Sequence, residues 1–339
     1  MDRSELTIDL GAVRRNARRL LEVLDGSELW AVVKADGYGH GAVDVAGAAL
    51  GAGASALCTA TVPEALVLRR AFPEARIVVL GPAPTAEVSE AREARLELTA
   101  ATDAIPEGVP VHLKLDTGMG RWGVSELPAT TANVVGVMSH LASADSDAAY
   151  TRRQTERFLE ATAGLEGPTR HLANSAGALR FPEARLDAAR CGIALYGLSP
   201  FGEDPSVDGL EPVLRWESVL AHVKLLRAGE STGYGRRFVA DRDTWIGIVP
   251  IGYADGFRRD LTGTTVLVGG EPRRVVGTVS MDAIAVELDR ELPPGEAVVL
   301  VGDGLLLEAH ARVAGTITYE LACGIGSSPL RSRRVVVDA

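Results

Sequence analysis

Two lysines and two arginines lie beside short apolar runs, where burial would change their chemistry. Lys34 follows AVV and precedes ADGYGHG, Lys114 and Arg121 lie in HLKLDTGMGRWGV, and Arg190 lies in RCGIALYG. A buried lysine loses proton affinity, so its amine becomes a usable nucleophile for a Schiff base. The ordinary alternatives are a solvent-exposed Lys34 and structural ion pairs of the arginines with Asp116 and Asp187.

Two histidines complete the set of chemically useful residues. His140 lies in MSHLASAD and His171 in HLANSAG, where Ser175 follows closely. Each histidine alone is better explained as a hydrogen-bonded core residue. The ordinary alternative for Ser175 and Gly192 is that they are turn residues. The glycines around the charged residues would also let backbone amides approach a ligand. The convergence of these residues, more than any one of them, indicates a site.

The chain up to about Leu214 alternates short apolar runs with helical patterns such as Pro63–Phe72, Ala86–Arg95 and Ala148–Ala163. Several runs are rich in β-branched residues without strict alternation, which is typical of strands buried on both faces. Strands that alternate with helices predict βαβ units and a parallel sheet. The expected strands are Leu29–Ala35, Ala56–Val62, Arg76–Gly81, Leu96–Ala100, Val109–Asp116, Val134–His140, Arg170–Asn174 and Arg190–Tyr196.

This series of strands predicts a TIM-type (β/α)8 barrel, with an open doubly wound sheet as the alternative. The dinucleotide fingerprint GxGxxG is absent after the first strand, which weakens the dehydrogenase form of that alternative. Active sites of barrels form at the C-terminal ends of the strands. The barrel hypothesis therefore brings the lysines, arginines and histidines named above to one mouth.

Beyond Leu214 helical periodicity largely stops, and strand-like runs are separated by turn residues such as Gly269–Gly270. This pattern predicts a smaller, mainly antiparallel β domain. We expect residues 1–214 to form the barrel and residues 215–339 to form the β domain. The expected strands are Val219–Leu226, Thr244–Ile251, Thr265–Val268, Arg274–Val279, Ala283–Leu288, Ala297–Val301 and Arg334–Val337.

The composition excludes some classes of protein. Asp and Glu total 45 against 35 Lys and Arg, a formal net charge of −10. This acidic balance argues against nucleic-acid binding, which usually needs a basic surface, and against docking on anionic lipid. The cysteines, Cys58, Cys191 and Cys323, are too few and too scattered for a disulfide framework or a zinc site.

No targeting segment is expected, and one apolar segment needs an explanation. The N-terminal sequence MDRSELTIDL is charged and lacks the apolar stretch of a signal peptide. Val45–Val62 carries no charge and is long enough for a membrane helix. However, Gly51 and Gly53 indicate the end of a helix, a turn and a buried strand. We expect a soluble cytoplasmic protein.

The motifs resemble those of bacterial alanine racemases, in the order in which that family carries them. They are AVVKADGYGHG, HLKLDTGMGRWGV, HLANSAG, RCGIALYGLSP, GYGRRF, PIGYADGF and VSMDA, and they span roughly residues 6–335. The resemblance implies an amino-acid racemase that uses pyridoxal 5′-phosphate (PLP) and is built from a barrel and a β domain. It also implies a function in supplying D-alanine for peptidoglycan.

The resemblance assigns two bases. Lys34 matches the lysine that holds the cofactor and exchanges a proton on the D-alanine face. Tyr234 matches the tyrosine that works on the L-alanine face, and His140 matches the histidine that orients it. This pairing suits racemisation, which removes a proton from one side of the α-carbon and returns one on the other. A phenol has a pKa near 10, so Tyr234 would need positive neighbours or hydrogen bonds.

The resemblance also implies a cofactor site. Arg190 matches the arginine that faces the pyridine nitrogen, and because it stays protonated it would not donate a full proton to the ring. His171 matches the histidine beside it. The remaining residues implied to bind the cofactor, most of them through its phosphate, are Tyr38, Asn174, Ser175, Gly192, Ile193 and Tyr319.

Substrate binding and assembly follow from the same resemblance. Arg121 matches the arginine near the substrate carboxylate, and Tyr253, Met281 and Asp282 match the substrate entrance. In the family, Tyr234, Tyr253 and Met281 reach the barrel of the other subunit, so a homodimer with shared active sites is implied. Many members carry a carbamylated lysine where this chain has Lys114. No metal is expected.

Two other functions remain open at this point. A racemase of serine or another small amino acid would use the same pair of bases, and only the entrance would distinguish it. A non-catalytic PLP-binding protein would lack both the β domain and the opposing tyrosine. This chain departs from the family pattern at Thr278, where the family commonly has arginine, and in the tail CGIGSSPLRSRRV. These departures bear on substrate breadth.

Overall fold

A computed structural model describes residues 2–326 and 328–339, and it divides the chain into two compact units. The first unit comprises Val13–Phe201 and Ser206–Glu211. The second comprises the N-terminal segment through Ala12, Gly202–Pro205 and Pro212–Ala339. The N-terminal segment, which the expected boundary at residue 214 assigned to the barrel, groups with the second unit because its strand pairs there.

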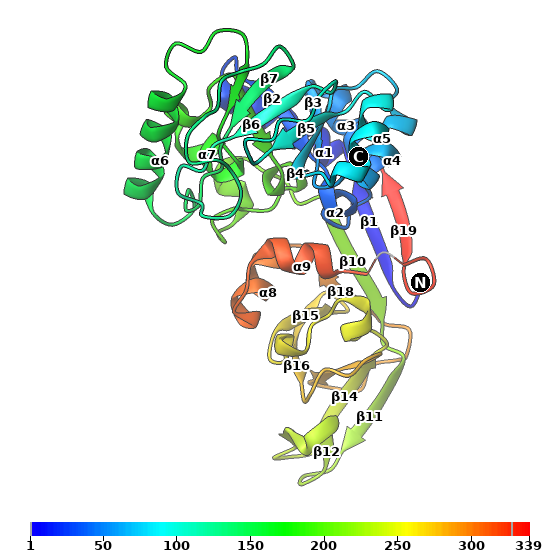
Figure 1. The fold of residues 1–339 in the computed structure, drawn as a ribbon. Helices are drawn as coiled ribbons and strands as arrows, with labels where there is room; N and C mark the ends of the chain where they lie inside the picture. Colours follow the sequence, from blue (N-terminus) through cyan, green and yellow to red (C-terminus); the bar gives the residue numbers. More distant parts are fainter. Residues whose placement is uncertain (1, 327) are drawn as a thin grey trace. The chain divides into compact units, whose positions relative to one another are not determined.

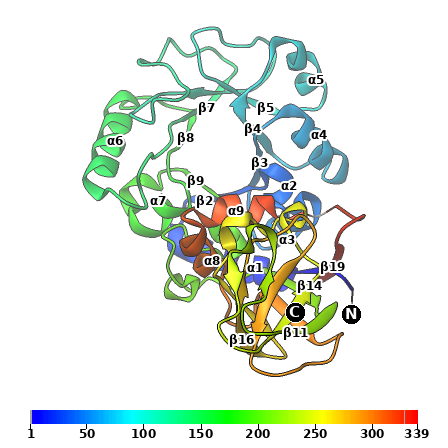
Figure 2. The same ribbon diagram turned by 90° about the horizontal axis from the view of Figure 1, so that it is seen from below.

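The first unit contains a closed parallel barrel, as predicted, and not the alternative open sheet. Strands such as β3 and β6 are buried along their whole length, which explains their lack of polar alternation. Figure 2 looks into the barrel and shows α4, α5 and α6 outside the ring of strands. The strands are β2 (Glu28–Val32), β3 (Ala56–Thr59), β4 (Ile77–Pro82), β5 (Glu97–Ala100), β6 (Val111–Lys114), β7 (Val134–Met138), β8 (Thr169–His171) and β9 (Ala188–Cys191).

Local signals set the starts of the helices between these strands. α4 begins after Thr61, whose side chain forms a reciprocal capping box with Glu64. α6 begins after Asp147, whose carboxylate accepts from the Tyr150 amide at 2.9 Å. The helices are α1 (Leu10–Leu24), α2 (Lys34–Tyr38), α3 (Ala42–Gly51), α4 (Val62–Ala71), α5 (Val88–Glu93), α6 (Ala148–Ala161) and α7 (Ser175–Arg180), with 3₁₀ turns η1 (Thr85–Glu87), η2 (Pro182–Ala184), η3 (Ile193–Tyr196) and η4 (Pro205–Asp208). They confirm the three predicted helical segments.

The uncharged segment Val45–Val62 is also as predicted. It contains the end of α3, a turn through Gly53 at φ +112° and the buried strand β3. Among residues 2–326 and 328–339, no helix is both long and apolar enough to cross a membrane.

The second unit is a mainly antiparallel sheet, which confirms the predicted β domain. Its 9 strands run in the order β11-β14-β17-β16-β15-β18-β10-β1-β19, and β1 lies between β10 and β19 (Figure 1). The strands are β1 (Glu5–Asp9), β10 (Leu214–Val219), β11 (His222–Leu226), β14 (Thr244–Val249), β15 (Thr265–Val268), β16 (Glu271–Val276), β17 (Ile284–Leu288), β18 (Ala297–Val301) and β19 (Arg333–Val337). A separate hairpin pairs β12 (Ser231–Thr232) with β13 (Phe238–Val239).

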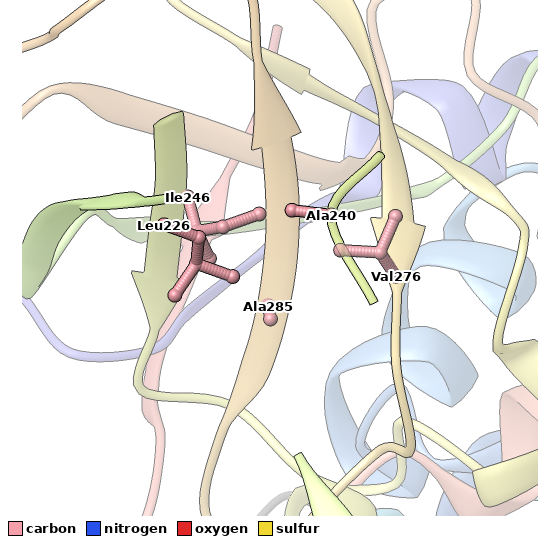
Figure 3. Close-up of a cluster of buried hydrophobic side chains, with 5 residues drawn as sticks. All are labelled: Leu226, Ala240, Ile246, Val276 and Ala285. Atoms are coloured by element: carbon pink, nitrogen blue, oxygen red, sulfur yellow. The ribbon is translucent and has the colours of Figure 1, made fainter. Parts of the chain in front are cut away.

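Part of the core of this unit lies between the sheet and the chain next to the hairpin. Leu226, Ala240, Ile246, Val276 and Ala285 form a buried cluster (Figure 3). Phe238, which begins β13, packs against this cluster. The cluster therefore anchors one end of the loop that carries Tyr234.

Three features of the second unit differ from the expectation. The expected strand Val219–Leu226 is broken, because the Leu220 amide bonds Glu296 and the Ala221 amide bonds Ile248, so the chain changes its partner strand there. Two helices, α8 (Leu307–Ala314) and α9 (Thr318–Gly324), lie in a region where the sequence pattern predicts mainly strands. Short turns η5 (Tyr234–Arg236), η6 (Tyr253–Asp255) and η7 (Arg259–Leu261) interrupt the strands.

A buried carboxylate joins distant segments of the second unit. Asp255, at the end of η6, accepts paired hydrogen bonds from Arg3 at 2.8 Å and from Arg331 at 2.8 and 3.1 Å. It also accepts from the Gly252 amide at 2.9 Å. Burial opposes ionisation of Asp255, but these hydrogen bonds outweigh it and hold its pKa below the ordinary value.

Replacing Asp255 with asparagine should therefore destabilise the second unit. The change leaves two arginines without their anion, and we expect a loss of about 2–3 kcal/mol, as for hydrogen bonds between charged groups. Urea unfolding would measure this loss. The Asp255→Asn variant should also lose the part of the acid sensitivity that comes from Asp255, because a lowered folded pKa gives stability that is present near neutral pH and lost as pH falls.

The matched control is Asp243→Asn. Asp243 pairs with Arg227 at 2.6 Å, but both side chains are at least half exposed, so its removal should change stability by less than about 1 kcal/mol. Equal effects of the two substitutions would contradict the anchoring role of Asp255.

Candidate active site

Lys34 begins an unusual turn at the C-terminal end of β2. The backbone of Ala35, Asp36 and Gly37 is left-handed, with φ of +52°, +49° and +62°, and φ of Tyr38 is +52°. A left-handed conformation costs roughly 1–2 kcal/mol for each residue other than glycine. Such strain persists only where the surroundings hold it, and it is common at functional sites.

Two carboxylates hold this turn. Glu64 accepts from the Ala35 amide at 2.7 Å through one oxygen and from the Ala60 amide at 2.8 Å through the other. Asp36 accepts from the Ala42 amide at 2.9 Å. Sequence reasoning did not identify Glu64 as part of the site, although its capping-box spacing from Thr61 was visible. These bonds fix the backbone on which Lys34 and Tyr38 are carried.

Hydroxyls and a backbone amide meet next to this turn. The Ser175 hydroxyl accepts from the Gly192 amide at 3.1 Å, and a Cβ at Gly192 would lie 2.4 Å from the Tyr38 hydroxyl. Gly192 is therefore needed for these groups to approach, and Ile193, which follows, is fully buried. The predicted phosphate-binding residues Tyr38, Ser175, Gly192 and Ile193 do come together. Hydroxyls and backbone amides of this kind suit a phosphate.

The Asn174 side chain makes local structural hydrogen bonds. Its side-chain oxygen caps α7 by accepting from the Gly177 amide at 2.9 Å, and its amide nitrogen lies 3.4 Å from the Leu141 carbonyl. This cap places Ser175 at the start of α7. A direct contact of Asn174 with a cofactor stays a prediction.

Arg190 is buried in β9 and is held by several acceptors. Its guanidinium donates to the carbonyls of Ser139 and Leu172 at 2.7 and 3.1 Å and to Nδ1 of His171 at 2.8 Å. Burial lowers its pKa to about 10, which still leaves it charged at neutral pH. The alternative ion pair with Asp187 is not formed, since Asp187 pairs with Arg170 at 3.4 Å.

A chain of hydrogen bonds crosses the barrel interior behind Arg190. Because arginine has no acceptor, Nδ1 of His171 must accept and its Nε2 must carry the proton. That Nε2 donates to Nδ1 of His112 at 2.8 Å, and Nε2 of His112 donates to Glu97 at 2.7 Å. Arg76 closes the chain with hydrogen bonds of 2.9 and 3.0 Å to Glu97. The chain thus has a single direction, with a cation at each end of it.

The hydrogen-bond chain behind Arg190 requires that both histidines are neutral and that the His112 ring has room beside Gly136. Burial and the charge of Arg190 hold the pKa of His171 well below its usual value. Burial also lowers the pKa of His112, against the opposing effect of Glu97. A Cβ on Gly136 would lie only 2.0 Å from Nδ1 of His112, so glycine is needed there. Sequence reasoning found His171 but missed His112 and Glu97, which lie on other strands.

His140 follows β7 and faces the same arginine. Its Nδ1 lies 3.4 Å from Nη2 of Arg190. Burial and then the charges of Arg190, Lys114, Arg121 and Lys34 hold the pKa of His140 well below its usual value, so the ring is neutral. A neutral ring that accepts from Arg190 can still donate through its other nitrogen.

Lys114 ends β6, and Arg121 lies in the loop that follows. Lys114 is 4% exposed, and burial followed by the charges of Arg190, Arg121 and Lys34 lowers its pKa to about 8. The Trp122 ring lies 5.3 Å from the Lys114 amine and 5.0 Å from the Arg121 guanidinium. The alternative partner of Arg121, Asp116, instead accepts from the amides of the loop, including that of Met119 at 2.8 Å.

The barrel mouth thus carries an excess of positive charge. Lys34, Lys114, Arg121 and Arg190 all act on the pKa of His140, and each lowers it. Asp116, the acidic group named beside them, is occupied by backbone amides. The phosphate of a cofactor and the carboxylate of an amino acid would together offset this charge, and the Tyr38, Ser175 and Gly192 groups fit a phosphate. The residues present therefore fit PLP, which the resemblance implies.

The other predicted residues lie in the second unit. Tyr234 on η5 is 74% exposed, Tyr253 on η6 is 41% exposed and Met281 is 52% exposed. Asp282 accepts from Arg331 at 2.7 Å, which ties it to the Asp255 network. Tyr319 lies on α9 and is half-buried. The contacts of these residues with a barrel site stay predictions.

The Tyr253 and Met281 segments are joined directly. The Tyr253 amide donates to the Ser280 carbonyl at 3.0 Å, and the Ala254 amide donates to the Met281 carbonyl at 3.0 Å. A Cβ on Gly252 would lie 2.3 Å from both of these carbonyl oxygens, so glycine is needed for the contact. Backbone hydrogen bonds therefore hold the two residues expected at the substrate entrance, Tyr253 and Met281, in a fixed arrangement relative to each other.

Comparison with known proteins covers almost the whole chain. The family model "Alanine racemase, N-terminal domain" matches residues 8–200, and "Alanine racemase, C-terminal domain" matches residues 213–335. The chain is 40% identical over 351 residues to "Alanine racemase 1" of Bacillus subtilis (strain 168), covering 94% of this chain and 90% of that relative.

Solved structures agree with these matches. The crystal structure of alanine racemase from E. faecalis has a TM-score of 0.91 and 39% identity, covering 98% of both chains. The structure of alanine racemase from Bartonella henselae "with covalently bound pyridoxal phosphate" has a TM-score of 0.89 and 28% identity, covering 98% of this chain and 99% of that one.

Proposed function

This chain belongs to the alanine racemase family, and on that premise we propose that it interconverts L-alanine and D-alanine with PLP as cofactor and two bases, Lys34 and Tyr234. The observation that carries the proposal is the first-unit site, where Lys34, a phosphate-type cradle and the buried Arg190 occur together. Every relative reported above is named as an alanine racemase, which supports the proposal.

Each residue that is proposed to hold PLP has its own role. Lys34 would hold it covalently, Tyr38, Ser175, Gly192 and Ile193 would bind its phosphate, and Arg190 would face its ring nitrogen. Asn174 would support Ser175, and His171 would keep Arg190 in place. Tyr319, which lies on α9 in the second unit, would add a phosphate contact. When bound, PLP accepts the electrons released as the α-proton of the amino acid leaves.

Arg190 shapes this chemistry through its charge. Its pKa of about 10 lies well above neutral pH, so it donates a hydrogen bond while retaining its proton. The chain through His171, His112 and Glu97 supports that orientation from behind. We infer that Arg190 would leave the ring nitrogen without a full proton, which would favour rapid return of a proton to the α-carbon of the substrate.

The two bases act on opposite faces of the α-carbon. Lys34 exchanges a proton through its amine on the D-alanine face, and Tyr234 exchanges one through its phenol oxygen on the L-alanine face. His140, a neutral ring held by Arg190, would donate a hydrogen bond to the phenolate of Tyr234 and stabilise that charged form.

Substrate binding involves residues from both units. Arg121 would bind the substrate carboxylate, and Tyr253, Met281 and Asp282 would form the entrance. We propose a homodimer in which the second unit of one protomer completes the first-unit site of its partner. The exposure of Tyr234, Tyr253 and Met281 in the single chain supports this arrangement.

Lys114 is proposed to be carbamylated. Because the pKa of Lys114 is about 8, a large share of its amine is neutral near pH 8. Only the neutral amine can attack CO₂. The nitrogen forms a bond to the carbon of CO₂, one amine proton leaves to solvent, and the negative carbamate then offsets Arg121 and Arg190. We expect native mass spectrometry in bicarbonate to find the added mass of one CO₂ in the protein and none in Lys114→Ala. A plain amine at Lys114 in bicarbonate would contradict this.

The physiological role follows from the reaction. D-alanine is a substrate for cell-wall synthesis, and we propose that this enzyme supplies it in the cytoplasm. The alternative substrate is serine or another small amino acid, for which the same bases would serve.

The test of the function uses purified, PLP-loaded protein. L-alanine, D-alanine and L-serine are incubated separately, and the loss of optical rotation is followed by polarimetry. We expect both alanine enantiomers to racemise faster than serine. If serine racemises while alanine does not, the alanine assignment is wrong, and if neither reacts, the assignment as a racemase fails.

A further inference from the structure

The loop that carries Tyr234 has little packing of its own to fix the direction of the phenol. The Tyr234 side chain is 74% exposed. The next two residues, Gly235 and Arg236, have φ of +71° and +50°, so the backbone turns sharply after Tyr234. On the C-terminal side the loop is anchored through β13 in the hairpin with β12.

A hydrogen bond from another segment fixes the peptide plane of Tyr234. The Thr278 hydroxyl, which is buried, donates to the Tyr234 carbonyl at 2.8 Å. A hydrogen bond to this carbonyl restrains the peptide plane after Tyr234, and with it the direction of the Cα–Cβ bond. Thr278 therefore acts on the direction of the phenol without touching it.

The two segments are in close backbone contact around this bond. A Cβ on Gly233 would lie 3.1 Å from the Thr278 nitrogen, and a Cβ on Gly277 would lie 2.9 Å from the Thr232 carbonyl oxygen. Both glycines have positive φ, +78° and +68°, which a larger residue would adopt only with strain. The close contact between the two segments therefore depends on glycine at both positions. Thr278 supplies a side-chain hydrogen bond across this contact.

The same segment also holds the entrance. Ser280, close behind Thr278, accepts from the Tyr253 amide at 3.0 Å. The segment 277–281 is thus joined to both the Tyr234 loop and the Tyr253 turn. A shift of this segment would move Tyr234 through the Thr278 hydrogen bond and the Tyr253 turn through the Ser280 hydrogen bond.

We propose that Thr278 is a positioning residue for the L-face base. Its hydroxyl restrains the backbone of Tyr234 and thereby orients the phenol toward the α-carbon of the substrate. The proposal rests on the proposed function of Tyr234. Catalysis depends steeply on position, because a misplacement of about 1 Å can cost about 100-fold in rate. The loss of one hydrogen bond to an exposed loop should have a smaller, measurable effect.

The experiment compares Thr278→Val with Thr278→Ser in the PLP-loaded protein. Valine keeps the shape of threonine without the hydroxyl, whereas serine keeps the hydroxyl. Exchange of the α-hydrogen in D₂O is measured by NMR, separately from L-alanine and from D-alanine. We expect Thr278→Val to slow exchange from L-alanine about tenfold relative to exchange from D-alanine, and Thr278→Ser to retain the wild-type ratio.

The ratio separates positioning from a general loss of structure. A merely structural role would slow both exchanges together, and exchange from D-alanine on the same sample reports the fraction of intact sites. An unchanged ratio in Thr278→Val, or the same change in Thr278→Ser, would overturn the proposal. Failure of the proposed function is distinct, because the unmodified protein would then exchange neither enantiomer.

Discussion

Replacing Lys34 with alanine is expected to reduce racemisation by about 10³-fold or more, because the substitution removes both a covalent anchor and a base. The visible absorbance of covalently held PLP should also disappear. The strained turn at Ala35–Tyr38 is held by backbone bonds to Glu64 and Asp36, and the substitution leaves these bonds in place. The variant should therefore fold normally. Absorbance spectra after dialysis against PLP, together with polarimetry, measure both losses.

Lys224 offers the matched control. It lies exposed on β11 in the second unit and is not among the residues proposed to hold the cofactor or the substrate. Lys224→Ala should keep both the absorbance and the activity. Retention of either property by Lys34→Ala, with native circular dichroism, would contradict the assignment of Lys34.

Replacing Tyr234 with phenylalanine should produce an effect that depends on the starting enantiomer. We expect racemisation to fall by about 10²–10⁴-fold, the usual contribution of a positioned base. In D₂O, exchange of the α-hydrogen should be lost from L-alanine but retained from D-alanine, because Lys34 still works on the D face. NMR of the recovered amino acid measures both exchanges.

This prediction contains its own control. Exchange from D-alanine in the same sample reports that cofactor and Lys34 are in place. The overall catalytic efficiencies in the two directions must fall together, since the enantiomers have equal free energy, so only the exchange separates the faces. Small and equal effects on both exchanges would count against Tyr234 as the L-face base.

The barrel was predictable because burial on both faces leaves a clear mark on short strands. Runs such as the one ending at Lys34 contain few polar residues, and helices with capping signals lie between them. Closure of the sheet was a preference over an open sheet, since both have the same local pattern. β1 was not predicted, because what makes Glu5–Asp9 a strand is pairing with β10 and β19, far away in sequence.

The site was predictable where a residue carries its own chemistry beside a strand end. Lys34, Arg190 and His171 fall in this class. Glu97 and His112 were missed because their role arises from contact between different strands of the barrel. The sequence marks Thr278 only as a departure from the family pattern, because its bond to Tyr234 joins segments that are 44 residues apart.

The most direct test of the two-base account follows the hydrogen through the unmodified enzyme. L-alanine is incubated in D₂O, and the first D-alanine formed is isolated and examined by NMR. With Tyr234 removing one hydrogen and Lys34 delivering another, the account predicts that nearly all of the product carries solvent deuterium at its α-carbon from the earliest turnovers. D-alanine that retains the hydrogen of the substrate would show a single base acting on both faces and would contradict the account.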